Sequence, residues 1–127
     1  MRNGSVAKFL KFWFPVILYS GIIFYASSIP NVTTPLQRIH FDKVLHLLEY
    51  IPFGFLMARG IYSVKPTISV QMLVTGVGLA AFLFGVSDEY HQSLVMGRSS
   101  SIIDLVGDSA GGLIGGYIYC LFTSKKS

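Results

Sequence analysis

The stretch "SDEYHQSLVMGRSSSIIDLVGDSAGG", residues 87–112, separates the last two apolar segments of the chain. It contains one of the three histidines, His91, a single arginine, Arg98, and four of the six acidic residues, which are Asp88, Glu89, Asp104 and Asp108. We interpret it as the outer end of one helix, a short turn that carries Arg98, and the polar, then glycine-rich, start of the next helix. The stretch therefore predicts a helical hairpin in an otherwise apolar chain.

The composition of the whole chain indicates a membrane protein. Of the 127 residues, 52% are hydrophobic and 13% are charged, and the mean hydropathy is +0.59. The hydrophobic fraction and the mean hydropathy are higher, and the charged fraction is lower, than in ordinary soluble domains. The length has room for one domain, which we expect to cover residues 1–127. A soluble bundle with unusually apolar helices is the alternative.

Four apolar segments are long enough to cross a bilayer. A hydrocarbon core of about 30 Å requires about 20 helical residues, and the candidate spans are residues 9–27, 44–62, 68–87 and 102–122. Pro66, in the short connection "SVKPT", suits the first turn of the third helix. The predicted fold class is all-α, an integral membrane bundle of four transmembrane helices.

The positions of the basic residues predict the orientation in the membrane. Lysine and arginine are retained on the cytoplasmic side. Most of the ten basic residues precede the first span, flank the turn between the second and third spans, or end the chain, and only Arg38, Lys43 and Arg98 lie on the other side. We therefore expect a multi-pass protein of the cell membrane (plasma or inner) with both termini cytoplasmic.

The first span has a second interpretation, as a cleaved signal peptide. It has a basic start, and the small residues Ala26, Ser27 and Ser28 follow its apolar run. The run is long, aromatic and interrupted by Pro15, which favours a retained signal anchor.

All acidic residues and all histidines fall in the half of the molecule that this topology places outside the cell. At helical spacing, residues three or four apart share one face. His46 and then Glu49 or Tyr50 continue the stripe of Asp42 on the second span. Gln92 lies one turn after Asp88 on the third span, and Asp108 lies one turn after Asp104 on the fourth. Such side chains are costly in contact with lipid. We expect the three stripes to converge on an outward-facing polar pocket.

Glycines on the fourth span predict close helix packing. Gly107, Gly111 and Gly115 form one row at four-residue spacing, and Gly112 and Gly116 form a second. Rows of small residues allow helix backbones to approach closely in lipid, and small residues of the third span, such as Gly76, Gly78 and Gly85, are the expected partners. Glycines scattered without a packing role are the alternative.

The connecting turn also has alternative interpretations. "SIID", residues 101–104, fits a capping box, so Asp104 is a candidate helix cap as well as a site residue. Arg98, beside Gly97 and near a helix N-terminus, suits a phosphate or carboxylate. The alternative is that Arg98 neutralises Asp88 or Asp104 within the protein.

Two motifs resemble the signatures of a known family. "DKVLHLLEY", residues 42–50, and "DEYHQSLVMGRSSSIIDLVGDSAGG", residues 88–112, are similar to those of the VanZ-like family of small integral membrane proteins, and the resemblance covers nearly the whole chain. Relatives commonly have Asn where this chain has Asp108, and "VPGR" where it has "VMGR". The resemblance implies a link to teicoplanin and related lipoglycopeptides, which act on peptidoglycan precursors at the outer membrane face.

Three mechanisms fit the polar residues. The first is binding or passage of an envelope lipid, a phosphorylated headgroup or a peptidoglycan precursor; its candidate binding residues are Asp42, Lys43, Tyr50, Gln92, Arg98, Asp104 and Asp108. The second is an enzyme that modifies such a lipid, with acid–base and orienting candidates His46, Asp88, Glu89 and His91. The third is a buried network that only fixes helix register. Membrane lipids are the expected partners, and no nucleic acid is expected, because no basic run with interleaved aromatics occurs.

No cofactor is predicted. A divalent cation is a weaker alternative, because His46, Glu49 and the other carboxylates and histidines resemble the ligands found in helical bundles. The chain has neither a Cys-x-x-Cys nor a His-Glu-x-x-His motif.

Overall fold

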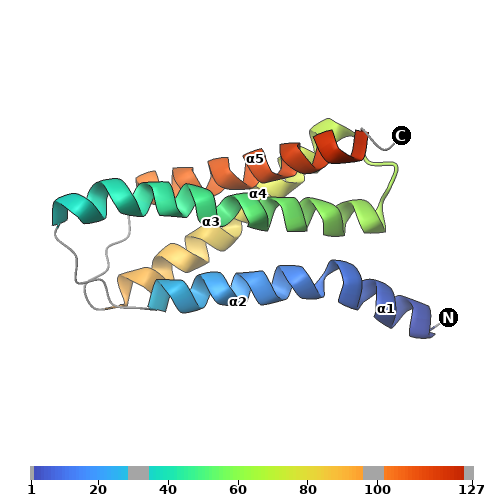
Figure 1. Ribbon diagram of the computed structural model, residues 1–127, viewed down its shortest axis with the longest axis horizontal. Helices are drawn as coiled ribbons and strands as arrows, with labels where there is room; N and C mark the ends of the chain where they lie inside the picture. The colour runs from blue at the N-terminus through green and yellow to red at the C-terminus, as the bar shows by residue number, and fades with distance from the viewer. Residues whose placement is uncertain (1, 29–34, 96–101, 125–127) are drawn as a thin grey trace.

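The computed structural model describes residues 2–28, 35–95 and 102–124, with side chains at 4–28, 44–95 and 102–123. All regular structure within these ranges is helical, and Figure 1 shows the arrangement of the helices, which are α1 (Arg2–Phe12), α2 (Phe14–Ser28), α3 (Pro35–Val64), α4 (Val70–Ser93) and α5 (Ile102–Ser124). Helix α1 begins and α5 ends at the same end of the bundle (Figure 1).

Four segments of the described chain are long and apolar enough to cross a membrane, which confirms the predicted all-α bundle of four spans. They are Gly4–Ser28, Val44–Val64, Val70–Ser93 and Ile102–Thr123. Many large apolar side chains lie on the outside of the bundle, including Leu18, Leu79 and Val106, each more than half exposed. Such a surface suits contact with lipid, because lipid tails are as apolar as these side chains.

The observed helices extend beyond several predicted spans. Helix α3 begins at Pro35, where proline fits the first turn because its missing N–H has no intrahelical partner. Helix α4 continues to Ser93, so Asp88, Glu89 and Gln92 are helical. The prediction for Pro66 is wrong: Pro66 lies in the turn, and Ser69 caps α4 by accepting a hydrogen bond from the Met72 amide at 3.2 Å.

The first span bends at Trp13, between α1 and α2, and Pro15 explains the bend. Proline has no N–H to donate to the carbonyl four residues earlier, which here belongs to Lys11. Arg59 of α3 donates to that carbonyl instead, with Nη1 2.7 Å from the oxygen, and its guanidinium lies 4.6 Å from the Phe12 ring centroid. These contacts fix the first span to α3 near the end of α3.

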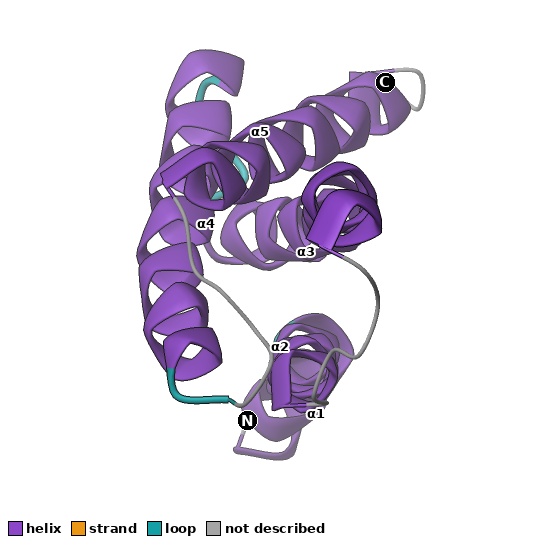
Figure 2. Cartoon of the chain, turned by 90° about the vertical axis from the view of Figure 1, so that its left-hand side faces the viewer, coloured by secondary structure: helices purple, strands orange, loops and turns teal. Residues whose placement is uncertain are grey.

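Helix α5 packs most extensively against α3 and then against α4, and α2 contacts both α3 and α4. Figure 2 shows the same grouping from a view turned by 90°. One part of the core joins α2, α3 and α4 through Ile23, Phe53 and Ala81, and Phe84 stacks on Phe53 with ring centroids 5.1 Å apart. A second part, around Ala58, Val77 and Cys120, joins α3, α4 and α5.

Glycines of α5 allow this close packing. A Cβ on Gly111 would lie 2.6 Å from the Leu47 carbonyl oxygen, and one on Gly115 would overlap the carbonyl of Ile51. This row therefore packs against α3, which corrects the expected pairing with the third span. The second row does meet α4: Gly112 contacts Ala81 and also Gly54 of α3, while Gly116 contacts Val77.

The prediction that Gly76 of α4 packs against the α5 glycines is wrong, since a Cβ on Gly76 would meet nothing within 4 Å. Gly78 faces Leu113, and Gly85 faces Leu105 and Asp108. Gly107 lies half-buried on α5, and its packing role stays a prediction.

Candidate functional site

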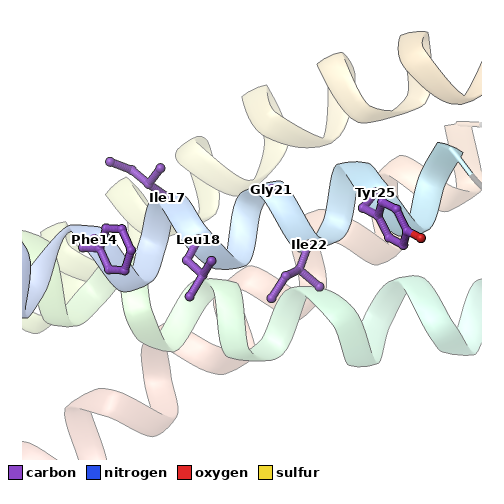
Figure 3. Close-up of a pocket in the computed structure, with 6 residues that line it drawn as sticks. All are labelled: Phe14, Ile17, Leu18, Gly21, Ile22 and Tyr25. Atoms are coloured by element: carbon purple, nitrogen blue, oxygen red, sulfur yellow. The ribbon is translucent and has the colours of Figure 1, made fainter.

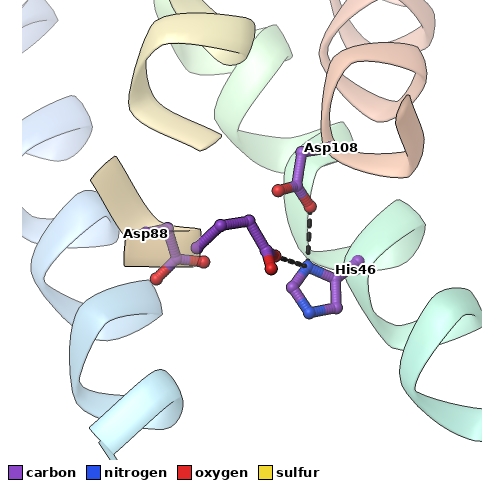
Figure 4. A group of neighbouring side chains, drawn as sticks. His46, Asp88 and Asp108 are labelled. Atoms are coloured by element: carbon purple, nitrogen blue, oxygen red, sulfur yellow. Dashed lines mark hydrogen bonds and ion pairs between the residues drawn. The ribbon is translucent and has the colours of Figure 1, made fainter. Parts of the chain in front are cut away.

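Polar side chains from three helices meet at the end of the bundle where α3 and α5 begin and α4 ends. His46 of α3, Asp88 and Glu89 of α4, and Asp108 of α5 are all buried, and one ligand atom from each lies within 4.8 Å of the others. Figure 4 shows that His46, Asp88 and Asp108 come from three different helices and point toward one another. We call these four residues the His46 cluster.

His46 and Asp108 form the shortest contact within the cluster. Nδ1 of His46 lies 2.7 Å from Oδ1 of Asp108, which accepts a hydrogen bond, and 3.6 Å from Oε1 of Glu89 (Figure 4). The hydrogen bond fixes the orientation of the imidazole ring. A carboxylate that orients an imidazole is a common arrangement in both acid–base sites and metal sites.

Asp88 is held by hydroxyl groups from two other helices. Ser27 of α2 donates to Oδ1 at 2.5 Å, and Tyr50 of α3 donates to Oδ2 at 3.3 Å. Ser27 is 3% exposed, and Asp88 and Tyr50 are fully buried. Asp88 therefore connects the first span to α3 and α4.

The residue spacing predicted three contributing helices and missed the contribution of α2. Besides Ser27, the hydroxyl of Ser28 lies 2.7 Å from Nε2 of His91, and the Tyr19 hydroxyl donates to the Glu49 carbonyl at 2.6 Å. Two adjacent serines at the end of an apolar span were the available signal. They also fit a signal-peptide cleavage site, which obscured their contacts with α4.

The remaining predicted site residues differ in position. Gln92 and Asp104 are buried, one turn from Asp88 and Asp108 respectively. His91 lies outside the cluster, against Ser28 and the edge of Phe24. Arg98 lies outside the described residues, as does Ser101 of the predicted capping box, and the side chains of Asp42 and Lys43 are not among those described.

Two hollows in the described surface lie away from the cluster. One is apolar and follows the outer face of α2 (Figure 3), lined by Phe14, Ile17, Leu18, Gly21, Ile22 and Tyr25. The other lies at the start of α4, lined by Gln71, Met72, Thr75 and Gly76. The convergence of polar side chains is observed, whereas an open pocket beside them stays a prediction.

Comparison with known proteins identifies the family of the chain. The family model described as VanZ/LLP1 matches residues 5–123, which is nearly the whole chain and includes all four spans and the His46 cluster. No curated protein and no solved structure matches the chain.

Proposed function

The chain belongs to the VanZ/LLP1 family, and from that premise we propose that it binds the phosphorylated headgroup of an envelope lipid at the His46 cluster. The observation that carries the proposal is the burial of one imidazole and three carboxyl groups in contact range at one end of the bundle. We propose that this end faces the extracytoplasmic side, where peptidoglycan precursors are exposed. Altered handling of such a lipid is the proposed link to teicoplanin susceptibility.

The energetic cost of the cluster supports a role in binding or chemistry. Asp88 and Asp108 are fully buried inside apolar helices, and removing carboxylates from water costs several kcal/mol each in real proteins. Apolar side chains of similar volume often stabilise a fold as well or better. A network that served only stability would therefore gain little from three carboxyl groups.

The ligand class follows from the charges expected at this end of the bundle. Arg38, Lys43 and Arg98 are the basic residues that the sequence assigns to the same side as the cluster, and arginine suits phosphate through its paired N–H donors. In this proposal Arg98 binds the phosphate, while the imidazole and the carboxyl groups of the cluster contact polar groups of the headgroup.

Binding is testable with a phosphorylated lipid and its uncharged analogue. Purified protein in detergent is titrated with farnesyl diphosphate and, separately, with farnesol. The proposal expects saturable binding of the diphosphate, at least tenfold tighter than that of farnesol, and loss of this preference in Arg98→Ala and Asp88→Asn. Glu49→Gln is the matched control, because Glu49 is half-buried on α3 outside the cluster. Equal binding of the two lipids would contradict the proposal.

The cellular role has its own test. Teicoplanin susceptibility is compared between cells that express the wild type, His46→Ala, Asp88→Asn, Arg98→Ala or Glu49→Gln at matched levels. The first three variants should lose any effect of the wild type, and Glu49→Gln should retain it. Full function in all of the first three would favour a purely structural cluster.

A second candidate function is hydrolysis of the bound headgroup. The observation that favours it is the His46–Asp108 hydrogen bond, because an imidazole oriented by a carboxylate is a suitable general base for activating water. In this mechanism, water attacks the terminal phosphorus of a lipid diphosphate as His46 accepts a proton from the water. The bond between that phosphorus and the bridging oxygen breaks, so the lipid monophosphate leaves and inorganic phosphate forms. Release of inorganic phosphate from farnesyl diphosphate, lost in His46→Gln while binding persists, would distinguish hydrolysis from binding.

A further inference from the structure

We propose that the His46 cluster binds one divalent transition-metal ion, with His46, Asp88, Glu89 and Asp108 as ligands. One ligand atom of each residue lies within 4.8 Å of the others. Ligands bind such ions at about 2.0–2.2 Å, so two ligands on opposite sides of one ion lie roughly 4.2 Å apart. Pairwise separations of at most 4.8 Å therefore place the four ligand atoms near the spacing of ligands on one ion, and side-chain adjustment would bring them onto it.

An unsatisfied oxygen supplies an independent observation. Asp108 is fully buried. Its Oδ2 atom is nevertheless without a hydrogen-bond partner among the residues that the structure describes. Figure 4 shows the carboxylate of Asp108 directed toward His46 and Asp88. A buried carboxylate oxygen without a partner carries a desolvation penalty, and a bound cation would offset it.

Gly85 leaves room for this oxygen. A Cβ at position 85 would lie 3.0 Å from Oδ2 of Asp108, closer than most real contacts of that kind. The absence of a side chain on α4 at this position therefore preserves space beside the carboxylate. A larger residue at position 85 would force Asp108 away from the cluster.

The ligand types indicate the class of metal. Three carboxyl groups and one imidazole carry an excess of potential negative charge, which a dication balances. Carboxylates suit Mn²⁺, whereas imidazole suits Zn²⁺ and Fe²⁺ better than it suits Mg²⁺ or Ca²⁺. Nδ1 of His46 now donates to Asp108, so coordination through that atom would release its proton.

A bound metal ion would also explain how the cluster attracts a phosphorylated headgroup. This part of the inference rests on the proposed function. Carboxylates alone repel a phosphate, whereas a cation held between them attracts its oxygens. The inference therefore assigns a part of headgroup binding to the metal ion held by the cluster. Metal binding without lipid tests the site, and lipid binding with and without metal tests the function.

The experiment uses the full chain, purified in detergent and stripped with a chelator. Mn²⁺ is titrated and monitored by electron paramagnetic resonance, and Zn²⁺ by calorimetry with Mg²⁺ as comparison. We expect about one saturable Mn²⁺ or Zn²⁺ per chain, and a higher melting temperature when it is bound. Asp108→Asn and Glu89→Gln should weaken binding at least tenfold, and Glu49→Gln should not.

A spectroscopic readout separates loss of a ligand from loss of the fold. Electron spin echo of bound Mn²⁺ should show coupling to an imidazole nitrogen in the wild type, and His46→Gln should lose it. Absence of saturable binding, or wild-type affinity in Asp108→Asn, would overturn the inference, as would bound Mn²⁺ without nitrogen coupling. If Mn²⁺ binds as expected but farnesyl diphosphate does not bind with it, the metal site stands and the proposed function fails.

Discussion

His46 on α3 and Asp108 on α5 form a buried hydrogen bond, with Nδ1 2.7 Å from Oδ1. The two helices approach closely enough for this because Gly111, less than one turn after Asp108, packs against the backbone of Leu47, the residue after His46. The same row of glycines that permits helix packing in lipid thus brings the acid and the imidazole together. Packing and polar chemistry depend on each other at this end of the bundle.

The His46–Asp108 pair should be energetically coupled. Removal of one partner leaves the other polar group buried without compensation, so His46→Ala should lower the free energy of unfolding by about 3–5 kcal/mol. Asp108→Ala in the same background should cost less than it does alone, with an interaction free energy of roughly 0.5–3 kcal/mol. Reversible unfolding in mixed detergent, followed by circular dichroism, measures the stability of the wild type, the two single variants and the double variant. Strict additivity would show that the pair is not coupled.

Ser27 should fix the first span to the rest of the bundle. Its hydroxyl donates to buried Asp88 at 2.5 Å, and a hydrogen bond to a charged group contributes about 1.5–3 kcal/mol. Ser27→Ala should therefore destabilise the protein by that amount in the same unfolding assay. Ser20→Ala is the matched control, because the Ser20 hydroxyl donates to the Val16 carbonyl of its own helix. Equal effects of the two substitutions would count against the contact between Ser27 and Asp88.

The glycines of α5 should differ sharply from Gly76 of α4. A Cβ on Gly115 would overlap the Ile51 carbonyl, and overpacking of this kind costs about 1–3 kcal/mol or more. Gly76 has nothing within 4 Å of an added Cβ, so Gly76→Ala should be neutral or stabilising by up to about 1 kcal/mol through helix propensity. Melting temperatures in detergent compare the two. A Gly115→Ala protein as stable as Gly76→Ala would contradict the close approach of α3 and α5.

The number of membrane spans and their helical class were predictable from the sequence, because span length and apolar composition follow directly from the thickness of a bilayer. Helix ends were less predictable. Helix α4 continues through polar Asp88 and Glu89 to Ser93, and a hydropathy criterion ends a span where polarity begins. Partner choice was also beyond the sequence: a glycine row shows that a helix packs closely, but not whether α3 or α4 receives it.

The convergence of His46, Asp88 and Asp108 followed from helical spacing and from the cost of exposing such groups to lipid. Ser27 could not be predicted in the same way, since a serine at the end of a span has many uses and no periodic pattern identifies its partner. Its role depends on the position of α2 against α4, which is a tertiary contact. Local spacing therefore predicts which face of a helix is polar, and the fold decides which faces meet.

Cysteines placed at the two ends of the bundle should react with a thiol reagent from opposite sides of the membrane. The distribution of lysine and arginine predicts that the α3–α4 turn is cytoplasmic and that the His46 cluster lies toward the outside. Cys120 is the single cysteine, so a Cys120→Ala background allows one new cysteine to be placed at a time. Lys65 in the turn and Ser93 at the end of α4 are both exposed, which makes them a matched pair of sites.

With a membrane-impermeant maleimide, Ser93→Cys should react in intact cells, and Lys65→Cys should react only after the membrane is opened. Retention of both proteins in the membrane fraction controls for misfolding. Because α4 crosses the bilayer between the two positions, labelling of both in intact cells would contradict the span itself. The reverse pattern would be consistent with the four spans but would place the His46 cluster on the cytoplasmic side. A peptidoglycan precursor at the outer face would then be excluded as the ligand.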